Sequence, residues 1–364
     1  MALRPIRVVL VAGARPNFMK AAPVLRTMHG DARFAPILVH TGQHYDTVMS
    51  DAFFADLEMP EPDVFLGVGA GTHAEQTGRV MVEFERYLAS ADADLVAVIG
   101  DVNSTLGCAV VAAKEGVAVA HIEAGLRSFD RSMPEEINRI VADSLSSILL
   151  TTSADADENL LREGHDRDEI HLVGNTMIDS LERYREQATD PAPIAAMGIE
   201  PGAYLLVTLH RPANVDDAGR LSLTLEALAS LDMPVVFPMH PRTRQVAERS
   251  GLPPVLERLR VLPPVGYLQF LRLQAHARLV LTDSGGIQEE TTILGVPCLT
   301  FRDNTERPIT ISHGTNRLIG TDAAHIAPEV RAALEAGTPP HRVPPLWDGR
   351  AAERIVAVLA DRYA

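Results

Sequence analysis

The sequence predicts an α/β protein with two doubly wound parallel-sheet domains. The chain has 364 residues, 46% hydrophobic and 22% charged, which is enough for two cores and too apolar for a disordered chain. Short runs rich in Val, Ile and Leu recur along it, each followed by a segment with helical periodicity. The runs are continuously apolar rather than alternating, as expected of strands that helices cover on both faces.

The expected strands fall into two series. The first series lies at residues 6–13, 35–42, 94–101, 117–125, 148–153 and 170–175. The second lies at 204–210, 233–240, 258–264, 277–284 and 296–301. The stretch 187–203 contains three prolines and is interpreted as a linker, and the residues after Trp347 have a helical period. We place the domains at 1–175 and 176–349, followed by a C-terminal helix at about 350–364.

Composition restricts the partners and the compartment. A net charge of -15 argues against the broad basic surface that nucleic acid or an anionic membrane requires, so an anionic ligand needs a local binding arrangement. Cys108 and Cys298 lie in apolar contexts far apart, which predicts buried thiols in a reducing, cytoplasmic compartment. No run of 18 apolar residues and no export signal is present, so no membrane span is expected.

Polar residues and glycines follow strand after strand. In open parallel sheets ligands bind beyond the carboxyl ends of the strands, where loops and helix N-termini converge. We therefore expect the working site at these positions, in a cleft between the two domains. They are residues 13–15, 42–44, Asp101, Glu123, His210, His240 and 283–286.

The segment TDSGGIQEE (282–290) is the most specific single element. The glycines allow backbone N–H groups to approach an anion, and the helix start adds positive potential, so Ser284, Gly285 and Gly286 predict a phosphate site with Arg307 nearby in sequence. The alternative is a simple helix start with Ser284 as its N-cap.

Two further glycine-containing segments precede helical stretches. GARPNFMK (13–20) offers Arg15 and Lys20 to an anion, although a surface Arg and Lys beside a helix start is the commoner arrangement. GVGAGTHAEQTG (67–78) resembles a dinucleotide fingerprint but lies outside the first strand–helix unit. We interpret it as a mobile loop and expect no tightly bound NAD and no other cofactor.

Three carboxylates differ in how easily a structural role explains them. Ser132 and Glu135 have the spacing of a capping box, which would fully account for Glu135. Asp101 and Glu123 end buried apolar strands, where a carboxylate needs a ligand or a partner. His121 with these two acids has no recognised metal-ligand spacing, so no metal is expected.

With these segments together, the chain resembles the non-hydrolysing UDP-N-acetylglucosamine 2-epimerases from end to end. The resemblance implies two Rossmann-like domains of glycosyltransferase B type, a C-terminal helix that packs back on the first domain, and a homodimer. The segments that carry it are GARPNFMKAAPVL, TGQHYD, GDVNSTLG, HIEAGLRSFDRSMPEEINR, LVGNTMIDSL, TLHRPANVDD, FPMHP, LTDSGGIQEE and RDNTERPITISHGTNRLIGTD.

The resemblance also implies an activity and a set of site residues. The family interconverts UDP-N-acetylglucosamine (UDP-GlcNAc) and UDP-N-acetylmannosamine (UDP-ManNAc), through elimination of UDP to 2-acetamidoglucal and its re-addition, and so supplies ManNAc units for glycan synthesis. The catalytic residues by similarity are Asp101, Glu123, Glu135 and His210. The residues expected to bind UDP and the sugar are Arg15, Lys20, His240, Phe270, Ser284, Gly285, Gly286, Glu290 and Arg307.

Several alternatives stay open. Val102 and Asn103 differ from the hydrolysing relatives, which favours the non-hydrolysing outcome. The allosteric activator contacts of some bacterial members are matched at Gln43, His44 and His240 but not at Tyr45, Asp46 or 67–71. A glycosyltransferase of the same fold, a silent nucleotide-sugar sensor, or the same chemistry on a 2,3-diacetamido uronic acid sugar are the competing functions.

Overall fold

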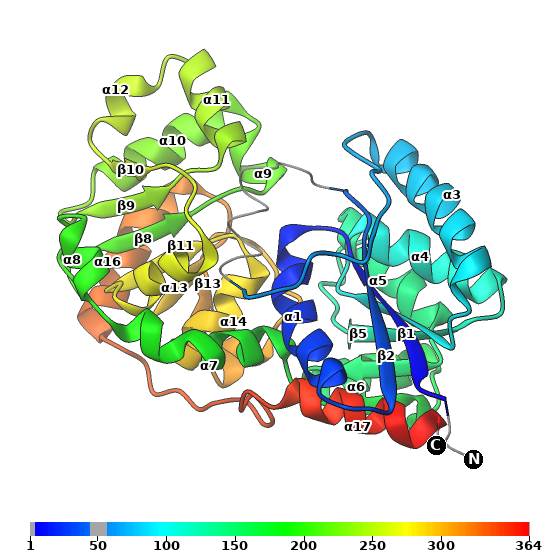
Figure 1. The fold of residues 1–364 in the computed structure, drawn as a ribbon. Coiled ribbons are helices and arrows are strands. Elements are labelled where there is room, and N and C mark those ends of the chain that lie inside the picture. Colours follow the sequence, from blue (N-terminus) through cyan, green and yellow to red (C-terminus); the bar gives the residue numbers. More distant parts are fainter. Residues whose placement is uncertain (1–3, 44–56, 364) are drawn as a thin grey trace. The chain divides into compact units, whose positions relative to one another are not determined.

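The computed structural model describes residues 4–43 and 57–363, apart from the side chains of Arg15 and Arg242. The chain divides into two compact units, Met1–Arg183 with Pro345–Ala364, and Tyr184–Pro344. Each unit contains one parallel sheet with helices on both of its faces (Figure 1). Among the described residues, no helix combines the length and apolarity needed to cross a membrane.

The first unit has a seven-stranded sheet in the order β3-β2-β1-β4-β5-β6-β7. Its strands are β1 (Ile6–Ala12), β2 (Phe34–His40), β3 (Val64–Phe65), β4 (Leu95–Ile99), β5 (Ala118–Ala124), β6 (Ile148–Thr151) and β7 (Ile170–Leu172). Its helices are α1 (Arg15–His29), α3 (His73–Ala91), α4 (Asn103–Lys114), α5 (Pro134–Leu145), α6 (Ala154–Glu163), the 3-10 turn η1 (Arg167–Glu169) and α17 (Ala351–Tyr363).

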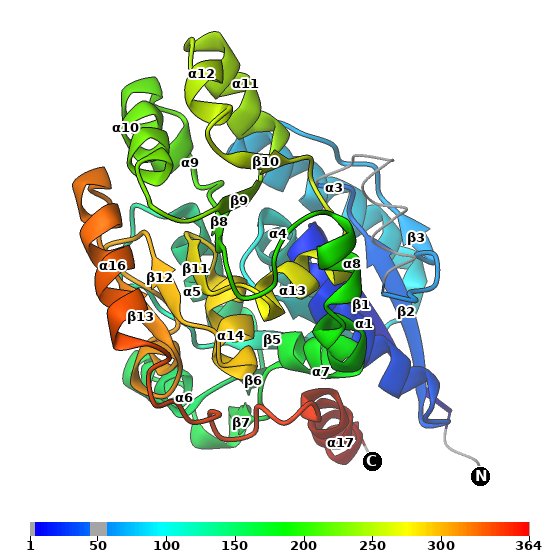
Figure 2. The same ribbon diagram turned by 90° about the vertical axis from the view of Figure 1, so that its left-hand side faces the viewer.

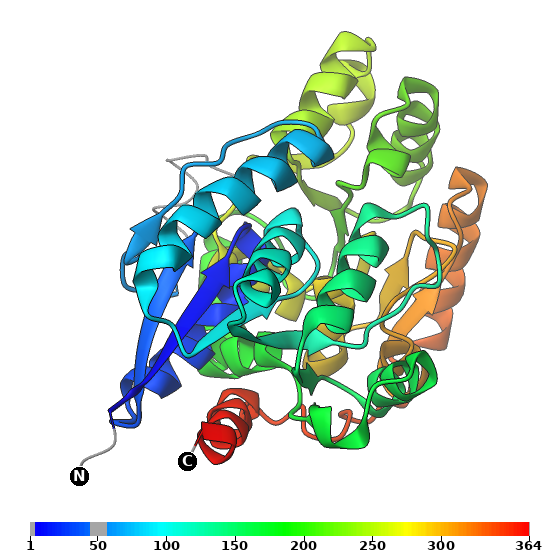
Figure 3. The ribbon, with the colours of Figure 1, turned by 90° about the vertical axis from the view of Figure 1, so that its right-hand side faces the viewer.

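Two helical layers cover this sheet. Helices α3, α4 and α5 pack side by side on one face, while α1 and α17 pack against each other on the opposite face (Figure 3). The strand order reverses between β1 and β4, so their carboxyl ends diverge into α1 and α4 at a topological switch point. Such a point is where open α/β sheets place their ligands.

The second unit has a six-stranded sheet in the order β10-β9-β8-β11-β12-β13. Its strands are β8 (Leu205–Thr208), β9 (Val235–Pro238), β10 (Arg260–Leu262), β11 (Leu279–Thr282), β12 (Cys298–Thr300) and β13 (Asn316–Leu318). Helix α7 (Thr176–Thr189) leads into it. Its other helices are α8 (Ala192–Ala196), α9 (Pro212–Val215), α10 (Ala218–Ala229), α11 (Pro241–Arg249), α12 (Pro253–Leu256), α13 (Tyr267–Ala275), α14 (Gly285–Leu294), α15 (Ile309–Ser312), the 3-10 turn η2 (Ala323–His325) and α16 (Ile326–Ala336).

This second sheet is also covered on both faces. Helices α10 and α16 pack over one apolar cluster, and α8, α13 and α14 over another (Figure 2). Successive residues of β8 feed the two clusters in turn, because neighbouring side chains of a strand point to opposite faces. Both faces are therefore hydrophobic, and the strands read as continuous apolar runs.

Every strand expected from the sequence is present, and both cysteines are buried free thiols. The short strands β3 and β13 were not expected. The stretch 187–203 is not an extended linker, since it contains the end of α7 and the whole of α8. Proline is tolerated in the first turn of a helix, so Pro191 and Pro193 begin α8 instead of preventing it.

Candidate functional site

In the first unit, the ends of β1 and β4 are held close together by the start of α1. A Cβ on Gly13 would lie 2.5 Å from Cβ of Ser104, so only glycine permits this approach of α4. The Asn17 side chain donates a hydrogen bond of 2.7 Å to the Ile99 carbonyl. The β1–α1 turn is thus tied to the segment that carries Asp101.

Glu123 stands in an unusual backbone conformation at the end of β5. Its φ is 73°, in the left-handed region that an L side chain rarely adopts, and the pairing with β6 shifts register between Ile122 and Ala124. The buried carboxylate forms an ion pair with the buried ammonium of Lys20 in α1. Backbone strain of this kind clusters at functional sites, which makes Glu123 a candidate.

Asp101 lies directly after β4 and faces α5. Its carboxylate forms an ion pair with the buried Arg139, and its backbone carbonyl accepts a 2.8 Å hydrogen bond from Asn138. Gly100, the preceding residue, has a φ of 65°, and a Cβ there would lie 3.2 Å from Oε2 of Glu123. Asp101, Glu123 and Lys20 therefore gather at one place in the first unit.

The capping box predicted for Ser132 and Glu135 is wrong. Helix α5 has Met133 at its N-cap and Pro134 as its first residue, while the Ser132 hydroxyl donates to Asp130. Proline favours the first helical position, so the helix begins one residue later than the spacing implies. In the described part of the chain no hydrogen bond or ion pair involves the Glu135 carboxylate, and the structural explanation for Glu135 is lost.

Its neighbour Glu136 carries the structural role instead. This buried carboxylate accepts hydrogen bonds from the backbone N–H groups of Ser128 and Phe129 and pairs with Arg139 at 2.6 Å. Burial opposes its ionisation, but these donors outweigh it and lower the pKa of Glu136. Glu135 stays partly accessible in the first turn of α5, close in sequence to the groups that hold Asp101.

In the second unit, His210 is paired with a residue at the end of a neighbouring strand. Its Nδ1 lies 3.1 Å from Oδ1 of Asp283, and Oδ2 of Asp283 also accepts from the Arg211 N–H and the Asn214 amide. Burial disfavours the imidazolium, but the Asp283 carboxylate outweighs it and raises the pKa of His210. His210 thus follows β8 as an oriented, half-exposed and readily protonated group.

The Ser284 to Gly286 turn opens α14 as the sequence predicts. Ser284 occupies the N-cap position, but its side chain makes no capping hydrogen bond, so capping does not explain the residue. A Cβ on Gly285 would lie 2.7 Å from Oε1 of Glu306 and would also strike the Arg307 guanidinium. The glycine therefore allows the 302–307 loop to approach the helix N-terminus.

Arg307 is buried among carboxylates rather than free. Its Nε donates to Glu289 at 2.6 Å, and Nη1 pairs with Glu306. Glu306 also bonds Arg302 at 2.7 Å and lies 3.7 Å from Arg211. These arginines thus gather beside the N-terminus of α14, a place that favours an anion.

Glu290 lies deeper on the same helix, fully buried in the second unit. The Gln274 amide of α13 donates to its Oε2 at 2.5 Å. Burial raises the pKa of Glu290 to about 7. Phe270, one turn along α13 from Tyr267, is partly buried against the cluster under α13 and α14.

The remaining predicted residues are less informative. His240 is exposed just after β9, and Arg15 is the first residue of α1, with its side chain outside the described part. Gln43 is buried, and its Oε1 accepts from the N–H and hydroxyl of Ser104 at 3.0 and 2.7 Å. His44, Tyr45 and Asp46 lie outside the described residues.

The glycine-rich segment 67–78 follows the short edge strand β3 and leads into α3, where Thr72 caps the helix and Glu75 completes a capping box. The Arg79 side chain holds the carbonyls of Val68 and Ala70 at 3.0 and 2.7 Å. The segment therefore belongs to the connection between β3 and α3 and not to the β1–α1 turn, where a dinucleotide fingerprint would stand.

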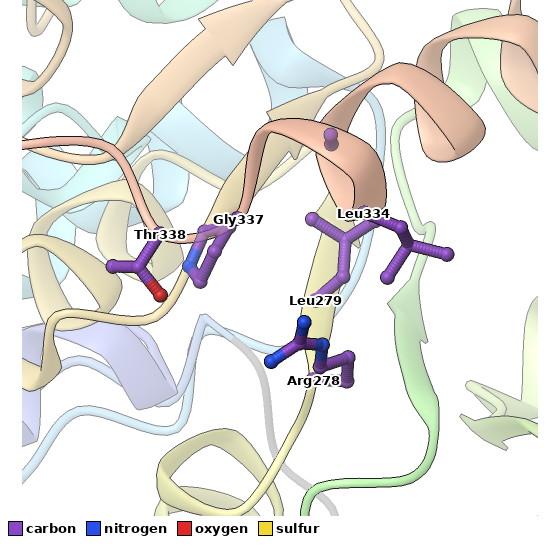
Figure 4. A pocket seen from close by; sticks show the side chains of 7 residues that line it. Arg278, Leu279, Leu334, Gly337 and Thr338 are labelled. Atoms are coloured by element: carbon purple, nitrogen blue, oxygen red, sulfur yellow. The ribbon is translucent and has the colours of Figure 1, made fainter.

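A small pocket in the second unit lies at the amino ends of the strands, whereas the candidate site residues lie at the carboxyl ends (Figure 4). It is lined by Arg278 and Leu279 at the start of β11 and by Leu334, Gly337 and Thr338 at the end of α16. Since parallel strands present their ligand sites at their carboxyl ends, this pocket is not part of the candidate site. Within the described ranges, no three His, Cys, Asp or Glu side chains are grouped to hold a metal ion.

Sequence reasoning missed the residues that hold the predicted ones in place. Arg139 and Glu306 are the main examples, and their ion pairs with Asp101 and Arg211 join residues that are far apart in the chain. Asp283, which pairs with His210, was among the strand-end residues that the sequence predicted, because it ends a buried apolar strand just as Asp101 does.

Comparison with known proteins agrees with this architecture. The family model described as UDP-N-acetylglucosamine 2-epimerase matches residues 26–360. A UDP-N-acetylglucosamine 2-epimerase of Methanocaldococcus jannaschii is 40% identical, over 97% of this chain and 99% of that protein. The UDP-2,3-diacetamido-2,3-dideoxy-D-glucuronate 2-epimerase of Pseudomonas aeruginosa is 43% identical, over 90% of this chain and 92% of that protein.

A solved structure gives the same result. The crystal structure of the M. jannaschii UDP-GlcNAc 2-epimerase in complex with UDP-GlcNAc and UDP has a TM-score of 0.91 and 39% identity, and the match covers 98% of this chain and all of that one. The prediction of two Rossmann-like parallel-sheet domains of glycosyltransferase B type is confirmed. The chain belongs to the UDP-N-acetylglucosamine 2-epimerase family, a family of isomerases.

Proposed function

We propose that this protein interconverts UDP-GlcNAc and UDP-ManNAc by inverting C2 of the sugar. The observation that carries the proposal is the buried Glu123 carboxylate, which is held in a left-handed backbone conformation and paired with Lys20 beside the Asp101 segment. Packing alone gives no reason for a strained, charged residue at a strand end. Membership of an epimerase family supplies the class of chemistry.

The proposed chemistry is an elimination followed by an addition. No carbonyl acidifies the hydrogen on C2, so simple deprotonation would be very slow. Instead the C1–O bond to UDP breaks while a base removes the C2 proton, and 2-acetamidoglucal and UDP form. UDP then adds back to C1 and a proton is delivered to the opposite face of C2. Atoms and charge balance without an oxidant or reductant.

Proton removal and return on opposite faces require two acid–base groups. Asp101, Glu123 and Glu135 are proposed to supply them. Glu123 is paired with the Lys20 ammonium and Asp101 with the Arg139 guanidinium. Glu135 has neither a capping role nor an ion pair within the described residues, and so stays available for proton transfer.

The second unit is proposed to hold the UDP portion. A protonated His210, the Ser284 to Gly286 turn and Arg307 would stabilise the charge that grows on the departing diphosphate, together with Arg15 and His240. Glu290 is proposed to accept hydrogen bonds from the ribose hydroxyls, and Phe270 to contact the uracil ring. These assignments are supported by the His210–Asp283 pair and by the arginine cluster at the start of α14.

We propose a second candidate substrate beside UDP-GlcNAc. The P. aeruginosa relative, named for a 2,3-diacetamido-2,3-dideoxy-D-glucuronate, is 43% identical, slightly more than the M. jannaschii enzyme at 40%. The same elimination and re-addition at C2 would apply to that sugar. The proposed reaction at C2 is thus the same for both sugars, which differ in their substituents at C3 and C6.

Turnover on a panel of UDP-sugars tests the proposal. We expect epimerisation of UDP-GlcNAc, of the diacetamido uronate, or of both, and none of UDP-glucose, which lacks the 2-acetamido group. Hydrolysis to free sugar and UDP as the main reaction, or no epimer from either 2-acetamido sugar, would contradict it. We further propose a homodimer that supplies ManNAc-type units for glycan synthesis, and light scattering at twice the chain mass would support the dimer.

A further inference from the structure

We propose that His121 and Asp143 are positioning residues, which together set the placement of the Asp101 and Glu123 carboxylates. This inference rests on the proposed function, because it assigns a role toward the two carboxylates that the function uses. Both side chains are completely buried, His121 in β5 and Asp143 in α5. Neither can touch a substrate, so any effect on catalysis must act through other residues.

The His121 ring connects α5 to the Gly100–Asp101 turn. Its Nδ1 lies 2.6 Å from Oδ1 of Asp143, and its Nε2 lies 2.8 Å from the Gly100 carbonyl. Both neighbours are hydrogen-bond acceptors, so the ring is held between the Asp143 carboxylate and the Gly100 carbonyl. The Gly100 N–H in turn donates to the Ile122 carbonyl at 3.0 Å, so both backbone polar groups of Gly100 are held.

Asp143 extends the network to the other carboxylate. Its Oδ2 accepts from the Gly125 N–H at 3.1 Å, two residues after Glu123 and immediately beyond the shift in register. The Asp143 carboxylate therefore fixes the backbone that follows Glu123 and, through His121, the turn before Asp101. The left-handed conformation of Glu123 needs such support, because a strained residue persists only where its surroundings over-determine it.

Arg127 and Glu163 continue the network toward the surface. Arg127 Nη2 lies 2.7 Å from Oδ2 of Asp143 and 2.6 Å from Oε2 of Glu163, whose side chain is partly exposed. The Asp143 carboxylate is therefore held by Arg127 as well as by His121. Burial opposes the ionisation of Asp143, but His121 and Arg127 outweigh it and lower the pKa of Asp143.

Two substitutions of His121 separate its two hydrogen bonds. In His121→Asn the amide nitrogen takes the place of Nδ1, so the bond to Asp143 is kept and the Gly100 carbonyl loses its donor. In His121→Gln the amide nitrogen takes the place of Nε2, so the Gly100 bond is kept and the Asp143 bond is lost. The two variants delete one bond each from the same buried position.

Asp179→Asn is the matched control. Asp179 is another buried carboxylate of the first unit, and it accepts from the N–H groups of Ala351 and Ala352 at 3.0 and 2.7 Å at the start of α17. Its substitution weakens the same unit, yet among the described residues no hydrogen bond joins it to Gly100 or Gly125. It reports what loss of stability alone does to turnover.

The full-length variants are compared by kcat, KM, Tm and the share of turnovers that release free 2-acetamidoglucal and UDP. We expect His121→Asn to lower kcat about 10- to 100-fold, since small displacements of reacting groups cost this much, with KM nearly unchanged. His121→Gln should keep more activity than His121→Asn, and glucal release should rise in His121→Asn. Asp179→Asn should keep its kcat at a similar loss of Tm.

A readout that does not depend on activity separates this inference from the proposed function. Amide hydrogen exchange over residues 100–103 should be faster in His121→Asn than in His121→Gln. Equal exchange and equal kcat in the two variants, or a kcat that follows Tm as in Asp179→Asn, would overturn the inference. If the wild type turns over no UDP-sugar, the proposed function fails, while the exchange comparison still decides whether His121 places the Gly100–Asp101 turn.

Discussion

Lys20 in α1 and Glu123 in β5 form an ion pair inside the first unit, with exposed fractions of only 8% and 5% for their side chains. The pair joins α1 to a residue at a strand end whose backbone has a φ of 73°. Burying two charges costs free energy unless each has its partner, so either residue alone would be unfavourable there. This relationship leads to the first prediction.

Glu123→Gln should lower kcat by about 10²- to 10⁴-fold, the usual contribution of an acid–base group. The same change leaves the Lys20 ammonium buried without its partner, so we expect a loss of about 3–5 kcal/mol in unfolding free energy. The double variant Lys20→Met with Glu123→Gln should recover much of that stability and none of the activity. Recovery of activity in the double variant would contradict the role of Glu123.

The His210–Asp283 pair predicts a pH window of stability. The folded pKa of His210 is raised above 6.5, so its contribution is complete below 6.5 and is lost as pH rises through the higher folded value. Burial opposes the ionisation of Asp283, but His210 and the other donors outweigh it and lower the folded pKa of Asp283 below 3.8. The contribution of Asp283 to stability is therefore lost as pH falls through that lower value.

The difference in unfolding free energy between the wild type and His210→Asn should therefore be largest between pH 3.8 and 6.5. It should shrink on both sides of this range. Denaturant titrations at a series of pH values measure it, and a difference that does not vary with pH would show that the pair is not ionised. The affinity for UDP should fall in the same variant, most strongly on the acidic side.

Substitution of Glu290 should raise stability at high pH and weaken UDP binding. Burial raises its folded pKa from 4.5 to about 7, so the fold favours the protonated acid and loses stability as pH rises through this range. Glu290→Gln removes this penalty. The unfolding free energy of the variant relative to the wild type should therefore be higher at pH 8 than at pH 4, by up to roughly 3 kcal/mol. The same variant should bind UDP at least about tenfold more weakly if the carboxylate holds the ribose.

Calorimetric titration with UDP and denaturant titration at both pH values measure the two effects. A Glu290→Gln variant that binds UDP as tightly as the wild type would remove Glu290 from the proposed ribose site. A stability gain independent of pH would contradict the raised pKa.

Two helical glycines provide a matched pair for the anion site. In Gly285→Ala the added Cβ would meet Glu306 and Arg307, so the 302–307 loop must shift and UDP affinity should fall by about tenfold or more. In Gly78→Ala, on α3, the added Cβ meets nothing within 4 Å, and stability should rise by about 0.5–1 kcal/mol with binding unchanged. Equal UDP affinity in the two variants would contradict a phosphate site at Gly285.

The sequence predicted the strands and the strand-end residues because both depend on local composition. Continuous apolar runs mark strands buried on both faces, and a charged residue that ends such a run is visible without tertiary information. The two short strands β3 and β13 have too few residues to show a pattern. The capping box failed because Pro134 starts α5 one residue beyond the position that spacing suggested.

The pairing of the site residues could not be predicted from the sequence, for a different reason. Arg139 lies 38 residues from Asp101 and His210 lies 73 residues from Asp283, so nothing local relates them. The left-handed conformation of Glu123 also depends on the register of β5 against β6. Such features follow from packing, and only the folded chain displays them.

The most direct test of the central claim is turnover of UDP-GlcNAc in deuterated water, followed by NMR of C2. Epimerisation through 2-acetamidoglucal removes the C2 hydrogen and returns one from solvent, so we predict UDP-ManNAc with deuterium at C2, and deuterium in the UDP-GlcNAc pool at equilibrium. UDP-ManNAc that retains its original C2 hydrogen, or UDP-GlcNAc that neither epimerises nor exchanges, would contradict the account.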